Sequence, residues 1–107
     1  MGFNLVVWAW SDDYDTSSKR RKRGVKYADI MNGFAQSGDH PAMRDFDFAE
    51  FEAAVVQEVG PEEVDGPYLI ERYPRARVFN LAHRDVPVLV PRIGYLARRF
   101  GLTSAEC

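Results

Sequence analysis

The sequence predicts an α+β fold: a ferredoxin-like split β-α-β arrangement in which an antiparallel sheet carries helices on one or both faces. Three observations lead to this prediction. An apolar run at 3–10 has the character of a strand, two amphipathic helical stripes follow it, and two β-type runs joined by a short link precede a last helix. The predicted order is βααββα, with residues 103–107 left open as a short edge strand or a frayed end. The 107 residues, 46% hydrophobic and 28% charged, fit a single domain over 1–107.

The first predicted strand, residues 3–10, contains seven apolar side chains in eight and no Gly or Pro. Such a run is typical of a strand that is buried on both faces. Alternate side chains of a strand point to opposite sides, so Trp8 and Trp10 share one face. That face needs a cover, which is either a helix of this chain or another molecule. Trp8 and Trp10 are therefore candidate interface residues, with a place in the core as the alternative.

Residues 11–24 show no hydrophobic period and are predicted to be a polar and basic loop. Basic side chains neutralise phosphates and release counterions, so nucleic-acid binding is one reading of the basic run inside this loop. No aromatic residue interrupts the run and the chain carries a net charge of −2, which favours a solvated loop or pairing with the chain's own acids. The candidate nucleic-acid residues are Lys19, Arg20, Arg21, Lys22 and Arg23.

Two amphipathic helices are expected next. The first begins after Val25 and ends at 37–38; its stripe is interrupted by Gly33, which weakens a helix by about 1 kcal/mol relative to Ala. Its apolar positions are Tyr27, Ile30, Met31, Phe34 and Ala35. The second is predicted to begin at Asp47 as N-cap, with Glu50 completing a variant of the capping box, and to end at Gly60. Phe46 and Phe51 occupy the positions of a hydrophobic staple.

The C-terminal half is predicted to contain a β-hairpin and a last helix. Residues 68–73 and 77–82 have strand character, and the link at 74–76 is short enough to require antiparallel pairing. Apolar residues at helical spacing follow from Val86 to Phe100. Because Pro91 lacks the N–H that a helix interior uses, the regular helix is expected to begin near Pro91 or to have a bent first turn before it.

The segment from Asp39 to Asp65 holds nine acidic residues against Arg44 alone. A protein that blocks a nuclease or another phosphate-binding toxin can present carboxylates where phosphates would bind, and complementary charge accelerates such association. Glu50, Glu52 and Glu58 are expected to face solvent and are candidate protein-interface residues. An ordinary solvated helix face is the alternative.

No catalytic, metal or cofactor site is predicted. Asp12, Asp13 and Asp15 match no calcium-loop spacing, and pairing with the adjacent basic run explains them. His40 and His83 have no ligand-spaced neighbour, and one cysteine excludes a disulfide framework. We therefore expect a cytoplasmic, non-enzymatic binding protein with no membrane segment. Its partner would be another protein, a second copy of itself or, in the alternative, nucleic acid.

Both ends of the chain resemble small uncharacterised bacterial α/β proteins, some of which resemble toxin-immunity proteins. The opening Met1–Trp8 matches their hydrophobic first strand, and the closing helix around Ile93, Leu96-Ala97-Arg98 and Gly101-Leu102 matches their last helix. This resemblance covers about a quarter of the chain. It implies an inhibitor that binds a toxin, and it brings no catalytic residues with it.

Overall fold

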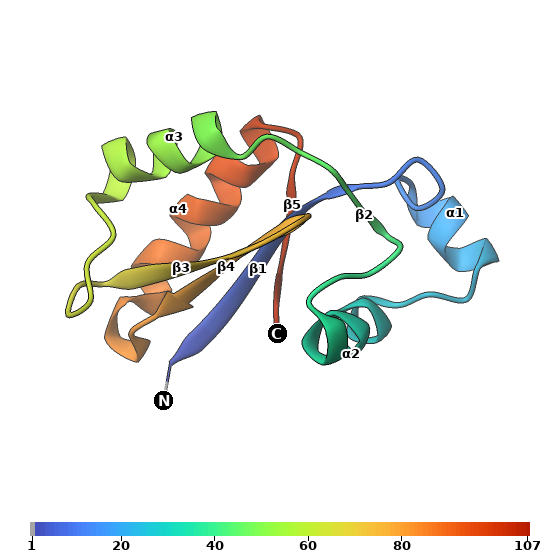
Figure 1. Ribbon diagram of the computed structural model, residues 1–107, viewed down its shortest axis with the longest axis horizontal. Helices are drawn as coiled ribbons and strands as arrows, with labels where there is room; N and C mark the ends of the chain where they lie inside the picture. The colour runs from blue at the N-terminus through green and yellow to red at the C-terminus, as the bar shows by residue number, and fades with distance from the viewer. Residues whose placement is uncertain (1) are drawn as a thin grey trace.

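The computed structural model describes residues 2–107. Over this range the chain forms an open antiparallel sheet of five strands together with four α-helices (Figure 1), which confirms the predicted α+β class. The strands are β1 (Phe3–Trp10), β2 (Met43–Arg44), β3 (Tyr68–Tyr73), β4 (Ala76–Leu81) and β5 (Thr103–Glu106). The helices are α1 (Ser17–Lys22), α2 (Tyr27–Ser37), α3 (Ala49–Val59) and α4 (Val86–Arg99), the last preceded by a 3-10 turn at His83–Asp85.

Strand β1 lies inside the sheet, as its apolar composition predicts. It pairs antiparallel with β4 along residues 3–8 and with β5 along residues 5–8, while its last two residues pair with β2. Strand β3 pairs with β4 through the predicted hairpin, which closes between Tyr73 and Ala76. The main sheet therefore runs in the order β5-β1-β4-β3.

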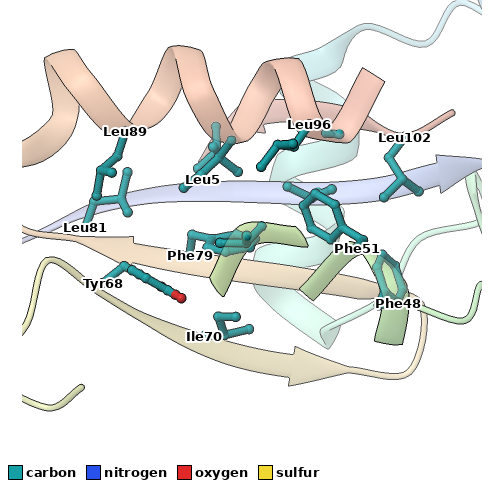
Figure 2. Close-up of a cluster of buried hydrophobic side chains, with 14 of the residues drawn as sticks. Leu5, Phe48, Phe51, Tyr68, Ile70, Phe79, Leu81, Leu89, Leu96 and Leu102 are labelled. Atoms are coloured by element: carbon teal, nitrogen blue, oxygen red, sulfur yellow. The ribbon is translucent and has the colours of Figure 1, made fainter. Parts of the chain in front are cut away.

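Helices α3 and α4 cover one face of the sheet and pack on each other (Figure 1). Leu5, Val7 and Ala9 of β1 point to this side and join the larger hydrophobic core (Figure 2). Helix α3 contributes Phe51, whose ring lies 5.9 Å from that of Phe79 on β4 in an edge-to-face arrangement. The remaining large side chains of this core include Phe48, Val55, Tyr68, Ile70, Leu81, Leu89, Ile93, Leu96 and Leu102.

Helix α2 covers part of the opposite face (Figure 1). Val6 and Trp8 of β1 point to this side and form a second core. The helix supplies Ile30, Met31 and Phe34 of the predicted stripe, whereas Tyr27 and Ala35 are exposed and the prediction for those two is wrong. Further members are Ala42, Met43, Ala76 and Val78. The sheet is therefore covered on both sides, which decides between the one-face and two-face arrangements that the sequence left open.

Three predictions about local structure are corrected. Residues 11–24 are not loop throughout, because Ser17–Lys22 form α1, capped by the Thr16 side chain, which accepts a hydrogen bond of 3.1 Å from the Lys19 N–H. Helix α3 begins at Ala49 with Phe48 as its N-cap, one residue later than the predicted N-cap at Asp47, although the Asp47 carboxylate does accept from the Ala49 N–H at 3.0 Å. The expected reciprocal bond to Glu50 is absent among the described residues.

Helix α4 runs continuously through Pro91 instead of beginning there. The first four N–H groups of a helix have no intrahelical partner, so a proline at the sixth position removes only one later bond. Pro87, in the first turn, removes a donor that would be unpaired in any case. At the C-terminus the question left open by the sequence is decided in favour of a strand, because β5 pairs with β1.

Candidate interaction surfaces

The two tryptophans of β1 lie in different environments. Trp8 is fully buried under α2, so it belongs to the core and the prediction that it forms an interface is wrong. Trp10 is half-buried at the end of the strand, with its ring 5.2 Å from that of Trp8 and 5.7 Å from that of Tyr27. The Trp8 indole Nε1 is buried and has no hydrogen-bond partner among residues 2–107.

Arg20 of the basic run covers Trp10. Its guanidinium carbon lies 4.2 Å from the centre of the Trp10 ring, within the range of a cation–π contact, and its Nη1 donates to the Tyr14 carbonyl at 2.6 Å. Arg23 makes a similar contact of 5.2 Å with the Tyr14 ring. Helix α1 buries no side chain, so it is held by surface contacts such as these and by the Lys19 Nζ, which donates to the Asp12 carbonyl at 2.8 Å.

The basic run is partly neutralised by the acids before it, as the sequence suggested. Lys19 forms an ion pair of 2.9 Å with Asp15 and Arg23 one of 3.6 Å with Asp13. The Asp15 carboxylate raises the pKa of Lys19 by accepting its hydrogen bond. Arg21 and Lys22 are exposed and form no ion pair with another described residue, so two of the five candidate nucleic-acid residues remain free.

The expectation that Glu52 faces solvent is wrong. Its two carboxylate oxygens accept from Arg72 Nη2 at 2.8 Å and from Arg77 Nε at 2.9 Å, and both arginines come from the β3–β4 hairpin. Arg72 also donates at 3.0 Å to Glu62, whose other oxygen accepts from the Ile70 N–H at 2.8 Å. These two bonds hold the pKa of Glu62 below its ordinary value. This network fastens α3 and the following loop to the edge strand β3.

Glu50 and Glu58, by contrast, are exposed on α3 as predicted and form no ion pair with another described residue. Glu63 and Asp65 in the next loop are also exposed and form no ion pair with another described residue. Two valines of the same segment are exposed as well, Val56 at 44% and Val64 at 83%. We call this set the acidic surface; it consists of Glu50, Glu58, Glu63, Asp65, Val56 and Val64.

The outward side of α4 lies next to the acidic surface and has the opposite charge. Val88 and Tyr95 are more than half exposed, one turn of helix on either side of Arg92. A cavity of about 220 Å³ separates Tyr95 and Arg99 on α4 from Glu58 on α3. The Glu58 carboxylate on α3 and the guanidinium groups of Arg92 and Arg99 on α4 therefore line the same cavity between the two helices.

A feature that the sequence analysis missed lies on the other face of the sheet, at the C-terminal end of α2. Here a groove of about 420 Å³ opens between the helix and strands β1, β3 and β4. Glu71 on β3 lies in it, and its oxygens accept from Tyr73 Oη at 2.9 Å and from Asn80 Nδ2 at 2.8 Å. The bond from Tyr73 to this carboxylate raises the pKa of Tyr73 above its ordinary value.

The hairpin register brings these groups together. Leu69 pairs with Asn80 and Glu71 with Val78, so Glu71 and Asn80 are diagonal neighbours on one face. The predicted hairpin did not contain this information: its three-residue link at 74–76 would pair Tyr73 with Arg77 and place Glu71 and Asn80 on opposite faces, whereas the observed turn pairs Tyr73 with Ala76. The contribution of α2 could not be foreseen, because the position of a helix over a sheet depends on long-range packing.

The residues considered for catalysis or metal binding have structural contacts. The His40 Nδ1 accepts from the Ala42 N–H at 3.0 Å, and burial lowers the pKa of this imidazole. No group of three His, Cys, Asp or Glu side chains suited to a metal ion occurs within residues 2–107. In the same range, no helix is both long enough and apolar enough to span a membrane.

Comparison of the chain with protein-family models gave no match. Comparisons with curated proteins and with solved structures gave no significant match either.

Proposed function

We propose that this chain is a non-enzymatic protein-binding module that engages its partner through the acidic surface of α3 and the following loop. The observation that carries the proposal is the separation of the acids into two groups. Glu52 and Glu62 are neutralised by arginines of the hairpin, whereas Glu50, Glu58, Glu63 and Asp65 form no ion pair with another described residue, and the same segment exposes Val56 and Val64. Unpaired charge on a segment that also exposes apolar side chains is typical of a binding surface.

The partner that fits this surface is a basic protein. The proposed role is that of an immunity-type inhibitor of a bacterial toxin, in which carboxylates occupy the place of substrate phosphates. Complementary charge steers association and confers specificity, and its effect falls as salt is added. The resemblance of the two chain ends to immunity-type proteins agrees with this role.

Self-association is the second form that the binding module can take. In a twofold dimer each copy presents the same patch, so α3 of one copy would face α4 of the other. Acids on α3 and Arg92 and Arg99 on α4 would then be complementary twice, around Val88 and Tyr95. Light scattering distinguishes this form from the inhibitor form, since only the dimer has twice the mass of the chain.

We further propose that the architecture is ferredoxin-like, with α1, α2 and β2 inserted between β1 and α3. The support is the strand order β5-β1-β4-β3 with antiparallel neighbours. Within this order, the strand–helix–strand units β1-α3-β3 and β4-α4-β5 interleave, as a split β-α-β arrangement requires. A solved structure with the two units packed differently would contradict it.

The test of the protein-binding proposal is capture from the native source at low salt, with the chain as bait. A variant carrying Glu50→Gln, Glu58→Gln, Glu63→Gln and Asp65→Asn should lose the partner, whereas Glu71→Gln, on the opposite face of the sheet, should retain it. Equal capture by the wild type and the fourfold variant, together with a monomeric mass, would overturn the proposal.

Nucleic-acid binding through α1 remains the alternative, and one contact favours it. The fold places Tyr27, 46% exposed, beside the basic helix, which supplies the aromatic neighbour that the linear run lacks. Changing Lys19–Arg23 to Gln should then abolish salt-sensitive retention of single-stranded DNA or RNA. Unchanged retention would exclude this function.

A further inference from the structure

The groove at the C-terminal end of α2 combines an apolar wall with the carboxylates of Glu71 and Asp39. Phe34 and Tyr73 form an edge-to-face pair with ring centres 5.0 Å apart, and both line the groove together with Val6 and Val78. Gly38, which ends α2 with φ of +74°, lies against the Tyr73 ring, so the helix end and the aromatic wall meet directly. The groove measures about 420 Å³, enough for a side chain or a small ligand.

The charge in this groove is not neutralised by the protein. Asp39 also lines it, but the Asp39 carboxylate is paired with Arg75 through two hydrogen bonds. Glu71 has only the neutral donors Tyr73 and Asn80 and forms no ion pair with another described residue. Each carboxylate oxygen can accept more than one hydrogen bond, so both oxygens of Glu71 retain acceptor capacity toward the groove.

We infer that this groove is a binding site for an alkylguanidinium group, the head of an arginine side chain, with Glu71 as its anion. A guanidinium presents two parallel N–H groups that match both oxygens of one carboxylate. Its planar cation also interacts favourably with aromatic rings, here Tyr73, while its methylene stem is suited to the apolar wall of the groove. A compact ammonium would satisfy the charge but not the bidentate geometry. The site is separate from the acidic surface and does not depend on the proposed function.

The test uses Nα-acetyl-arginine amide as the probe and the full chain with ¹⁵N labelling. We expect saturable shifts of the Asn80 side-chain amide and of backbone amides in β3 and at the end of α2, with a dissociation constant on the order of 1 mM for a ligand of this size. Nα-acetyl-citrulline amide replaces the guanidinium by a neutral urea of nearly the same shape. It should bind at least about tenfold more weakly, because the charge-assisted bonds are lost.

Two protein variants complete the test. Glu71→Gln should abolish the shifts, whereas Glu50→Gln removes an equally exposed, unpaired acid on the other face and should leave them unchanged. If Glu71→Gln does not fold, the comparison of the arginine and citrulline probes on the wild type decides alone. Equal binding of the two probes, no saturable shift, or retained binding by folded Glu71→Gln would overturn the proposal. Equal binding of Nα-acetyl-lysine amide would overturn its assignment to guanidinium.

Discussion

Trp8 and Trp10 are two residues apart on one face of β1, yet only Trp8 is core. Strand alternation placed them on the same face but did not indicate what would cover it. Helix α2 covers Trp8, while Arg20 of α1 lies on Trp10. The position of each indole therefore depends on segments that lie up to about two dozen residues further along the chain.

The unpaired Trp8 Nε1 allows a prediction at the residue scale. Trp8→Ala removes a fully buried indole and should lower the free energy of unfolding by about 3–5 kcal/mol. Trp8→Phe keeps most of the apolar volume and deletes a buried N–H that has no partner, so its cost should be below about 2 kcal/mol. Urea unfolding followed by circular dichroism measures both. Equal losses would show that the indole N–H contributes a hydrogen bond after all.

Glu50 and Glu52 show why exposure of single acids was only partly predictable. They are two positions apart on one helix, so they point to different sides, and the helical period alone assigned both toward solvent. The partners of Glu52 are Arg72 and Arg77, which are 20 and 25 residues away in sequence. No local pattern specifies a pairing at that separation.

At the scale of the elements, α1 and α4 show what hydrophobic periodicity does not predict. Helix α1 has no buried residue, so it carries no apolar stripe; the Thr16 cap and the Asp15–Lys19 pair stabilise it instead. Helix α4 has the stripe but contains Pro91, and packing of its apolar side offsets the loss of one hydrogen bond. The helices that bury an apolar stripe, α2, α3 and α4, were predicted, whereas α1, which has a cap but no buried side chain, was missed.

Two glycines inside helices give a matched pair of predictions. A methyl group on Gly33 would lie 2.8 Å from His40 Cδ2, whereas one on Gly94 would lie 3.6 Å from Ser104 Oγ, an ordinary contact. Gly94→Ala should therefore stabilise the protein by up to about 1 kcal/mol through helix propensity. Gly33→Ala should instead cost about 1 kcal/mol, because His40 must move and its bond to the Ala42 N–H is lost.

Calorimetry of the two alanine variants provides the measurement. The melting temperature should rise by a few degrees for Gly94→Ala and fall for Gly33→Ala, given about 4–8 °C per kcal/mol in a domain of this size. A rise for both variants would show that His40 does not hold its place against α2.

At the scale of the whole molecule, charge is distributed by pairing rather than by sequence segment. The basic residues of α1 meet the acids before them, and the hairpin arginines meet Glu52, Glu62 and Asp39. Among the described residues, the charges that form no ion pair include those of the acidic surface, Arg92 and Arg99 on α4, Arg21 and Lys22 on α1, and Glu71 in the groove. A net charge of −2 gives no indication of this arrangement.

The pH dependence of stability follows from three pKa values that folding lowers. Burial lowers the pKa of His40, with Asp39 and Asp29 opposing, and hydrogen bonds from Arg72 and Arg75 lower those of Glu62 and Asp39. A group with a lowered pKa binds its proton more readily when unfolded, so its stabilisation is present above the unfolded pKa and is lost as the pH falls. The loss should begin below 6.5 with His40 and continue below 4.5 and 3.8 with the two acids.

Unfolding by urea at a series of pH values tests this order. His40→Gln should flatten the dependence between pH 6.5 and 5 and leave the steeper loss below pH 4.5 in place. His83→Gln, at the exposed turn before α4, is the matched control for replacing a histidine by glutamine. An unchanged slope in His40→Gln would show that the imidazole does not contribute to acid lability.

The sequence by itself determined the α+β class, the buried first strand, the buried positions Ile30, Met31 and Phe34 of α2 and the antiparallel pairing of the hairpin. These follow from residue periodicity and turn length, which are local properties. Only the tertiary structure decided that Trp8 is core, that Glu52 is paired and that Glu71 stands in a groove beside Phe34. Each of these depends on which side of the sheet a helix covers, and that is set by packing between residues far apart in the chain.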